Sequence, residues 1–130
     1  MQRTFMNAKI HRATVTDSDL SYVGSLTLSP ELLEAAGIGL GECVQVVNIN
    51  NGTRFETYTI LGEPGVYEVI VNGAAARLVQ KGDKVIIITY ARLTEEEQAK
   101  HESKTVFVDD DNRPVAENYS GHVLPELADW

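Results

Sequence analysis

Short runs of β-branched and aromatic residues, separated by turn signals, recur along most of the chain. Each run favours an extended strand, and the runs cover residues 3–16, 43–49, 54–61, 66–73 and 83–93. Asn-Asn-Gly-Thr at 50–53 is typical of a hairpin turn between two of them. Many short strands with few helices predict an all-β fold, and a small closed barrel would remove its exposed sheet edges.

Two short segments carry helix signals. Ser29 suits an N-cap, Pro30 suits the first helical position, and Gly37 supplies a left-handed stop. Thr94 opens a second helix over residues 94–101. Residues 74–79 are expected to form one helical turn at most.

The chain contains an internal echo. Residues 38–48 and 79–89 share a pattern in which glycine and an acid precede Val and further aliphatic residues. Two copies predict two similar halves, each with a turn that feeds a strand. Residues 85–88, Val-Ile-Ile-Ile, make both strand faces apolar. We therefore expect another subunit to cover the outer face.

Composition excludes several classes of function. The 130 residues predict a single domain, and the net charge of −8 at pH 7 disfavours nucleic acid as a partner. Neither a membrane span nor an export signal is found, so we expect a cytoplasmic protein. The one cysteine, Cys43, is expected to be a small core residue. The acidic runs at 95–97 and 109–111 are expected on the solvated surface.

Gly24 and Ser25 interrupt two strand-like stretches. One interpretation is a tight turn. The other is chemical, because a serine hydroxyl can attack the carbonyl carbon of the preceding residue and replace the peptide bond by an ester. Elimination across the serine Cα–Cβ bond then breaks the chain, and the resulting dehydroalanine hydrolyses to a pyruvoyl group. Gly24 favours this route, because it has no side chain to block the attack.

Four blocks in colinear order support the chemical interpretation. They are KIHRATVTDSDLSYVGS (9–25), NGTRFETYTI (51–60), VNGAAA (71–76) and GDKVIII (82–88). Together they resemble the bacterial aspartate 1-decarboxylases, a family of pyruvoyl enzymes, over roughly residues 1–92. Beyond about Leu93 the resemblance is loose.

The resemblance implies a fold and an activity. The fold would be a small closed six-stranded double-psi β-barrel with short helices, with residues 1–100 as the catalytic domain and 101–130 as a C-terminal tail. The protein would be a cytoplasmic homotetramer with active sites between subunits. It would convert L-aspartate to β-alanine and CO2, supplying pantothenate and coenzyme A biosynthesis. Its cofactor would be the pyruvoyl group from Ser25, with no metal and no pyridoxal phosphate.

The resemblance also implies roles for residues that match the family's motifs. Ser25 becomes the pyruvoyl group that forms a Schiff base with the substrate, and Tyr58 donates a proton. Arg54 binds a substrate carboxylate, for which a guanidinium fork is suited, and Lys9 is a second cation. The remaining substrate-binding residues are Thr57, Asn72, Gly73, Ala74 and Ala75. Processing would involve Gly24, Ser25, Thr57, Tyr22 and His11, although His11 could equally be a packing residue.

Two alternatives stay open. A different pyruvoyl decarboxylase would use the same cofactor, but a basic substrate would call for acidic residues in place of Arg54 and Lys9. A non-catalytic barrel module would retain the scaffold without the chemistry, which the presence of Ser25, Arg54 and Tyr58 disfavours. The sequence does not decide whether cleavage is spontaneous or needs an activating protein.

Overall fold

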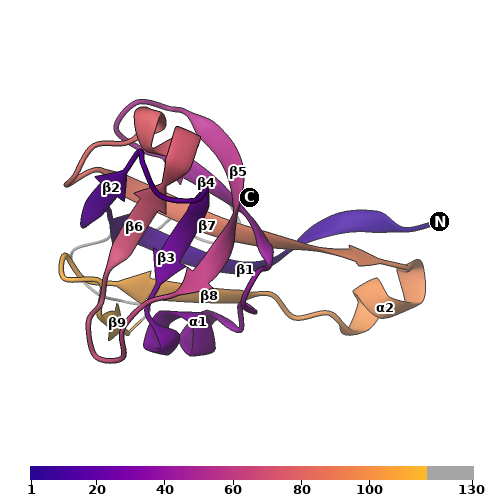
Figure 1. Ribbon diagram of the computed structural model, residues 1–130. Helices are drawn as coiled ribbons and strands as arrows, with labels where there is room; N and C mark the ends of the chain where they lie inside the picture. Colours follow the sequence, from indigo (N-terminus) through magenta and orange to yellow (C-terminus); the bar gives the residue numbers. More distant parts are fainter. Residues whose placement is uncertain (117–130) are drawn as a thin grey trace.

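The structure is a computed structural model, which describes residues 1–116. Within those residues the chain forms nine strands and three short helical segments (Figure 1). The strands are β1 (Arg3–Thr14), β2 (Asp17–Asp19), β3 (Ser25–Leu28), β4 (Cys43–Asn48), β5 (Arg54–Leu61), β6 (Val69–Asn72), β7 (Lys84–Leu93), β8 (Lys104–Val108) and β9 (Pro114–Val115). The helical segments are α1 (Pro30–Ala36), the 3-10 helix η1 (Gly73–Leu78) and α2 (Glu95–Lys100).

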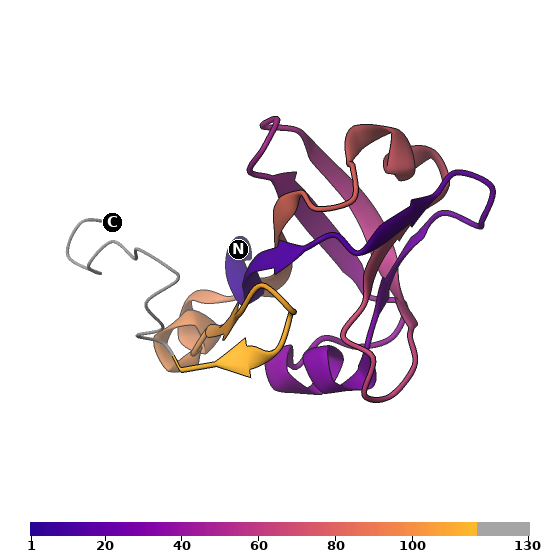
Figure 2. The same cartoon turned by 90° about the vertical axis from the view of Figure 1, so that its left-hand side faces the viewer.

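The strands form a strongly curved sheet in the order β2-β6-β3-β5-β4-β7-β1-β8-β9. Figures 1 and 2 show them wrapped around a common interior, with α1 across one end and α2 on an arm made by β1 and β7. Thr16, just after β1, hydrogen-bonds Val69 at the start of β6. This contact joins β1 and β6, two strands that are far apart in the strand order. The all-β, barrel-like prediction is confirmed, although strand pairing does not clearly close the sheet.

Alternating burial along the strands sets the core. In β7, Val85 and Ile87 are fully buried, whereas Ile86 and Ile88 on the outer face are half-buried. β4 buries Val44 and Val46 in the same way. This is the period-2 pattern of a sheet with one face inside. Cover of the outer face by another subunit remains a prediction.

Cys43 corrects one expectation from the sequence. It is exposed, at the first position of β4. Alternation explains this, because Val44 takes the inward position and Cys43 therefore faces outward. Cysteine prefers burial only on average, and strand register decides the individual case.

The internal echo corresponds to a repeated local structure. Gly41 and Gly82 both have positive φ, 75° and 95°, in the turns that lead into β4 and β7. A residue with a Cβ would be strained in that region of φ. β4 and β7 then pair with each other antiparallel.

The helix signals are confirmed at both ends of α1 and at the start of α2. The Ser29 hydroxyl accepts from the Leu32 N–H, and Gly37 ends α1 with φ 68°. Thr94 and Glu97 form a capping box, each side chain accepting from the other's backbone N–H. Hydrogen bonds from the Thr94 backbone N–H and side chain lower the pKa of the Glu97 carboxyl below its usual value of 4.5. No helix within residues 1–116 has the length and apolar character needed to cross a membrane.

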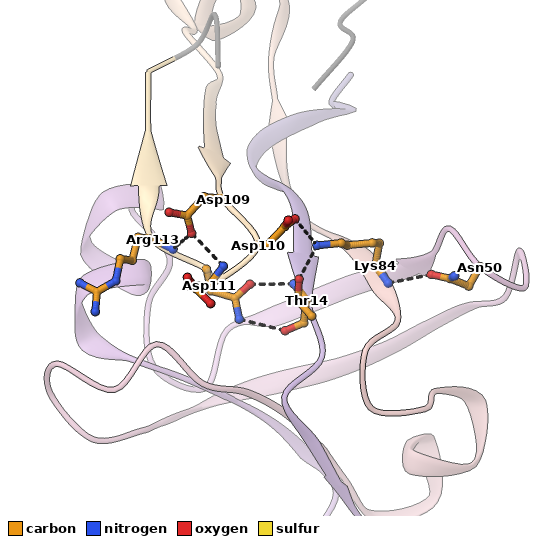
Figure 3. Close-up of polar contacts among 8 residues, drawn as sticks. Thr14, Asn50, Lys84, Asp109, Asp110, Asp111 and Arg113 are labelled. Atoms are coloured by element: carbon orange, nitrogen blue, oxygen red, sulfur yellow. Dashed lines mark hydrogen bonds and ion pairs between the residues drawn. The ribbon is translucent and has the colours of Figure 1, made fainter. Parts of the chain in front are cut away.

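The segment after α2 returns to the barrel and is fastened there by a tight turn (Figure 3). β8 pairs parallel with β1, and Val108 is fully buried. Asn112, with φ 64° and 1% exposure, donates to the carbonyls of Thr14 and Tyr67 and accepts from the Thr14 N–H. The boundary at residue 100 between domain and tail remains a prediction; the part of that tail from 117 to 130 lies outside the described residues.

The acidic run in that turn is exposed at two of its three positions, Asp110 and Asp111. Asp110 forms an ion pair with Lys84 at 2.8 Å. Half-buried Asp109 accepts from the backbone N–H groups of Asp111 and Arg113. The expectation of a solvated surface therefore holds for Asp110 and Asp111, whereas Asp109 shapes the turn.

Candidate active site

The Ser25 hydroxyl is buried at the start of β3 and carries two hydrogen bonds. It donates to the Val23 carbonyl at 2.9 Å and accepts from Asn72 Nδ2 at 3.0 Å. Ser25 is 1% exposed, while Gly24 before it is exposed. The geometry is more specific than an ordinary turn, because a surface serine in a loop would be solvated and free to rotate.

Strand register brings Asn72 to Ser25. β3 and β6 are antiparallel, and Ser25 pairs directly with Asn72, the last residue of β6. The Asn72 amide also donates to Thr27 Oγ1 at 3.0 Å, so both of its N–H bonds are directed at hydroxyls. The structure therefore brings together two predicted site residues, Ser25 and Asn72, and adds Thr27.

Gly73 lies against Gly24. It has φ +74°, and a Cβ placed there would come within 2.6 Å of the Gly24 Cα and 3.3 Å of the Tyr22 carbonyl oxygen. Only glycine permits this approach, because real Cβ atoms do not come so close to backbone. Ala74 and Ala75 follow in η1, exposed and half-buried respectively. The Asn-Gly-Ala-Ala stretch therefore sits beside the Gly24-Ser25 peptide.

Arg54 and Tyr58 share the outer face of β5, as their spacing predicts. Both are exposed, Tyr58 at 41%, and Thr57 between them is half-buried and faces the other way. β3 runs parallel to β5 with Leu26 opposite Thr59, so Tyr58 occupies the register position next to Ser25. The Arg54 Nη1 donates to Gln45 Oε1 at 3.0 Å.

Lys9 lies on the same outer face, three strands away. It pairs with Ile88, and Ile88 pairs with Gln45. Directly paired residues present their side chains on the same side of a sheet, so Lys9 and Gln45 face the same way. Two strands, β7 and β4, separate β1 from β5. Within one chain Lys9 therefore shares a face with Arg54. Its strand, β1, does not neighbour β3, the strand of Ser25.

His11 and Tyr22 occupy different surroundings. The His11 ring packs edge-on against Phe107 of β8, with centroids 5.7 Å apart. Tyr22 is 53% exposed in the loop before Gly24. The structure thus places Tyr22 in the loop before Gly24 and His11 against β8, and their roles in processing remain predictions.

Three residues at the site were missed from the sequence: Thr27, Gln45 and Tyr90. Gln45 had a signal, because it is polar within the apolar run of β4 and alternates with buried Val44 and Val46. Its contacts with Arg54 and Tyr90 depend on the pairing of β4 with two other strands. Nothing in the sequence distinguishes Thr27 from an ordinary strand threonine.

Comparison with known proteins identifies the class of this constellation. A family model for aspartate decarboxylase matches residues 1–115. The chain belongs to the aspartate decarboxylase family. The matched range includes Gly24, Ser25, Arg54, Tyr58 and the 3-10 helix η1 after Asn72.

Individual relatives in the family are similar over most of their length. The aspartate 1-decarboxylase of Caldicellulosiruptor saccharolyticus is 63% identical over 110 residues, which cover 85% of this chain and 86% of the relative. That of Ruminiclostridium cellulolyticum is 57% identical over 123 residues, covering 94% and 96%. That of Neisseria meningitidis is 60% identical over 113 residues, covering 87% and 89%.

Proposed function

We propose that this protein decarboxylates L-aspartate to β-alanine and CO2. The observation that carries the proposal is the match to the aspartate decarboxylase family over residues 1–115, at up to 63% identity to a named aspartate 1-decarboxylase. The buried Ser25–Asn72 contact beside Gly24 supports it independently.

The cofactor we propose is a pyruvoyl group made from Ser25. The surroundings fit its formation: Gly24, which carries no side chain to hinder attack on its carbonyl carbon, directly precedes the buried Ser25 hydroxyl. The hydroxyl proton has an acceptor in the Val23 carbonyl, and Asn72 restricts the rotation of the Ser25 side chain. Such a group supplies a carbonyl that takes the substrate amine and accepts the electrons released as CO2 leaves.

Formation of the group consumes only water. The Ser25 oxygen bonds to the Gly24 carbonyl carbon and the peptide C–N bond breaks, which leaves an ester and a free amine. Loss of the Ser25 α-proton breaks the Cβ–O bond and releases the Gly24 carboxylate. Water then adds to the dehydroalanine and ammonia departs, so the chain ends as two pieces.

The outer face of the sheet supports recognition of a dicarboxylate. Arg54 and Lys9 face the same side, and aspartate brings two carboxylates. Two cations on one face offset the net charge of −8, which would otherwise repel such a substrate. Tyr58, on the same face as Arg54, holds a proton that it can give to the carbon that loses CO2.

The proposed assembly is a homotetramer with active sites between subunits. The half-buried Ile86 and Ile88 and the exposed aromatic rings of Tyr58 and Tyr90 on one face support burial against a second copy. A neighbouring copy would also let Lys9 of one chain approach Ser25 of another.

Intact-mass spectrometry of the purified full-length protein tests the proposal. We expect two chains, residues 1–24 and 25–130, whose masses sum to about one unit above the precursor, and Ser25→Ala should remain whole. Turnover of L-aspartate compared with L-glutamate tests the substrate. A wild-type protein that stays one chain and still decarboxylates aspartate would remove the pyruvoyl group from the proposal.

A further inference from the structure

The Gln45 side chain receives two donors at a single atom on the outer face of the sheet. Arg54 Nη1 lies 3.0 Å from Gln45 Oε1, and the Tyr90 hydroxyl lies 2.6 Å from the same oxygen. The Tyr90 hydroxyl can donate a hydrogen bond, and the Arg54 guanidinium can only donate. Both therefore need an acceptor, which the Gln45 side-chain carbonyl oxygen supplies. The three side chains join β5, β4 and β7 into one fixed arrangement.

The acceptor that orients Arg54 is neutral. Among residues 1–116 no carboxylate lies within 4.0 Å of the Arg54 guanidinium. The salt bridge formed within those residues joins Lys84 and Asp110 instead. Even Glu56, which shares the outer face of β5 and pairs in register with Gln45, forms no ion pair with it. Gln45 therefore occupies one N–H of Arg54 while the full charge and the other donors remain for an anionic ligand.

Tyr90 holds the Gln45 side chain in one orientation. A half-buried glutamine such as Gln45 still has several rotamers, and holding one of them costs conformational entropy. The Tyr90 hydroxyl selects the rotamer in which Oε1 meets Arg54, because the same oxygen serves both donors. Tyr90 and Arg54 lie on strands either side of β4, so the selection depends on the sheet order.

We propose that Gln45, held by Tyr90, is a positioning residue that orients Arg54 for a substrate carboxylate without neutralising it. The inference rests on the proposed function, in which Arg54 binds a carboxylate of aspartate. It assigns to position 45 a requirement for a neutral acceptor. Glutamate there would make the same hydrogen bonds and cancel the charge.

Gln45→Glu tests the charge requirement on the full-length protein. We expect kcat/KM for L-aspartate to fall about tenfold or more, carried mainly by KM, because the substrate carboxylate must compete with a fixed one. The loss should shrink as ionic strength rises from 0.05 to 0.5 M. Cleavage at Gly24-Ser25, followed by intact mass, should proceed as in wild type, because Ser25 and Asn72 do not contact Gln45.

Gln98→Glu is the matched control, since it adds the same charge on exposed α2 and should leave kcat/KM unchanged. Gln45→Ala and Tyr90→Phe test orientation, and each should raise KM about two- to fivefold with little change in kcat. In an Arg54→Gln background, Gln45→Glu should have no further effect on kcat/KM, because the coupling passes through Arg54.

The outcomes separate the inference from the function it rests on. If wild type does not decarboxylate aspartate, the proposed function fails, and the inference falls with it. If wild type is active and Gln45→Glu has wild-type kcat/KM, the positioning role is overturned. It is also overturned if Gln45→Glu lowers kcat/KM by the same factor in the wild-type and Arg54→Gln backgrounds. Should Gln45→Glu fail to cleave or fold, Gln45→Ala and Tyr90→Phe decide, and unchanged KM in both refutes the proposal.

Discussion

At the scale of single residues, the site depends on which atoms each position can bring close together. Ser25 is held by Asn72 from the neighbouring strand, and Gly73 admits Gly24 to a distance that no other residue would allow. The outer face of β5 carries Arg54 and Tyr58 four residues apart, which is two repeats of the pleat, with Gln45 of β4 alongside. Two substitutions separate maturation from turnover at this scale.

Tyr58→Phe should mature normally and turn over slowly. Phenylalanine keeps the ring on the outer face of β5 but has no proton to give, so kcat for β-alanine formation should fall about a hundredfold or more. Intact mass should still show complete cleavage at Gly24. Wild-type kcat in this variant would exclude Tyr58 as the proton donor.

Gly73→Ala should slow cleavage severely. The added methyl group would lie 2.6 Å from the Gly24 Cα, so the Gly24-Ser25 peptide must shift, and the residue must also hold φ +74°. Gly52→Ala separates the two effects, because Gly52 has φ +76° but open space around it. Equal cleavage rates in Gly73→Ala and Gly52→Ala would show that the close approach is unimportant.

At the scale of elements, caps and turns help to hold the ends of the chain's segments in place. α2 has six residues, none of them buried, and begins at the Thr94–Glu97 capping box. The segment after α2 is held to β1 by the turn around Asn112. Each of these features predicts a measurable effect.

Thr94→Ala should raise the Glu97 pKa part of the way towards its ordinary value of 4.5, because alanine keeps the backbone N–H but removes the side-chain hydrogen bond. In the native protein, hydrogen bonds from the Thr94 backbone and side chain favour the carboxylate and lower that pKa. A lowered folded-state pKa contributes stability above the unfolded value, and this is lost as pH falls through the folded value. NMR titration of the Glu97 carboxyl measures the shift, and identical titration curves in wild type and variant would contradict it.

Asn112→Ala should lower the free energy of unfolding by about 1–3 kcal/mol, because the Thr14 N–H and two carbonyls lose their partner in a buried place. The positive φ of 64° adds strain for alanine. Exposed Asp111→Asn next to it should change thermal stability little. Matching melting temperatures for Asn112→Ala and wild type would argue against this turn as a clamp.

At the scale of the whole molecule, the proposed cleavage should not separate the two pieces. β1, the main element of residues 1–24, lies between β7 and β8, and its Ile10 and Ala13 are fully buried. The loop at Gly24 is exposed, so breaking the peptide bond after Gly24 leaves the pairing of β1 with β7 and β8 intact.

Native mass spectrometry should therefore find residues 1–24 bound to residues 25–130, in a particle about four times the 14.3 kDa chain mass. Denaturing conditions should release the short piece. Dissociation of the short piece in native buffer would mean that strand pairing does not retain it. A stable particle of one chain mass would end the tetramer proposal.

The sequence by itself determined the alternation of buried and exposed positions, the capped starts of α1 and α2, and the Gly-Ser pair at 24–25. These are local properties: β5 spans the predicted residues 54–61, and Ser29, Gly37 and Thr94 act as caps where their side chains and φ angles suit a helix end. The family resemblance likewise rests on short blocks that can be read in order along the chain.

Only the tertiary structure decided which strands are neighbours, and with that which side chains meet. Cys43 is exposed because β4 begins in that register, and Gln45 reaches Arg54 and Tyr90 because β4 lies between β5 and β7. Ser25 meets Asn72 across 47 residues of sequence. Such contacts depend on long-range pairing, whose energy comes from burying both strands at once, so no local pattern in either strand specifies its partner.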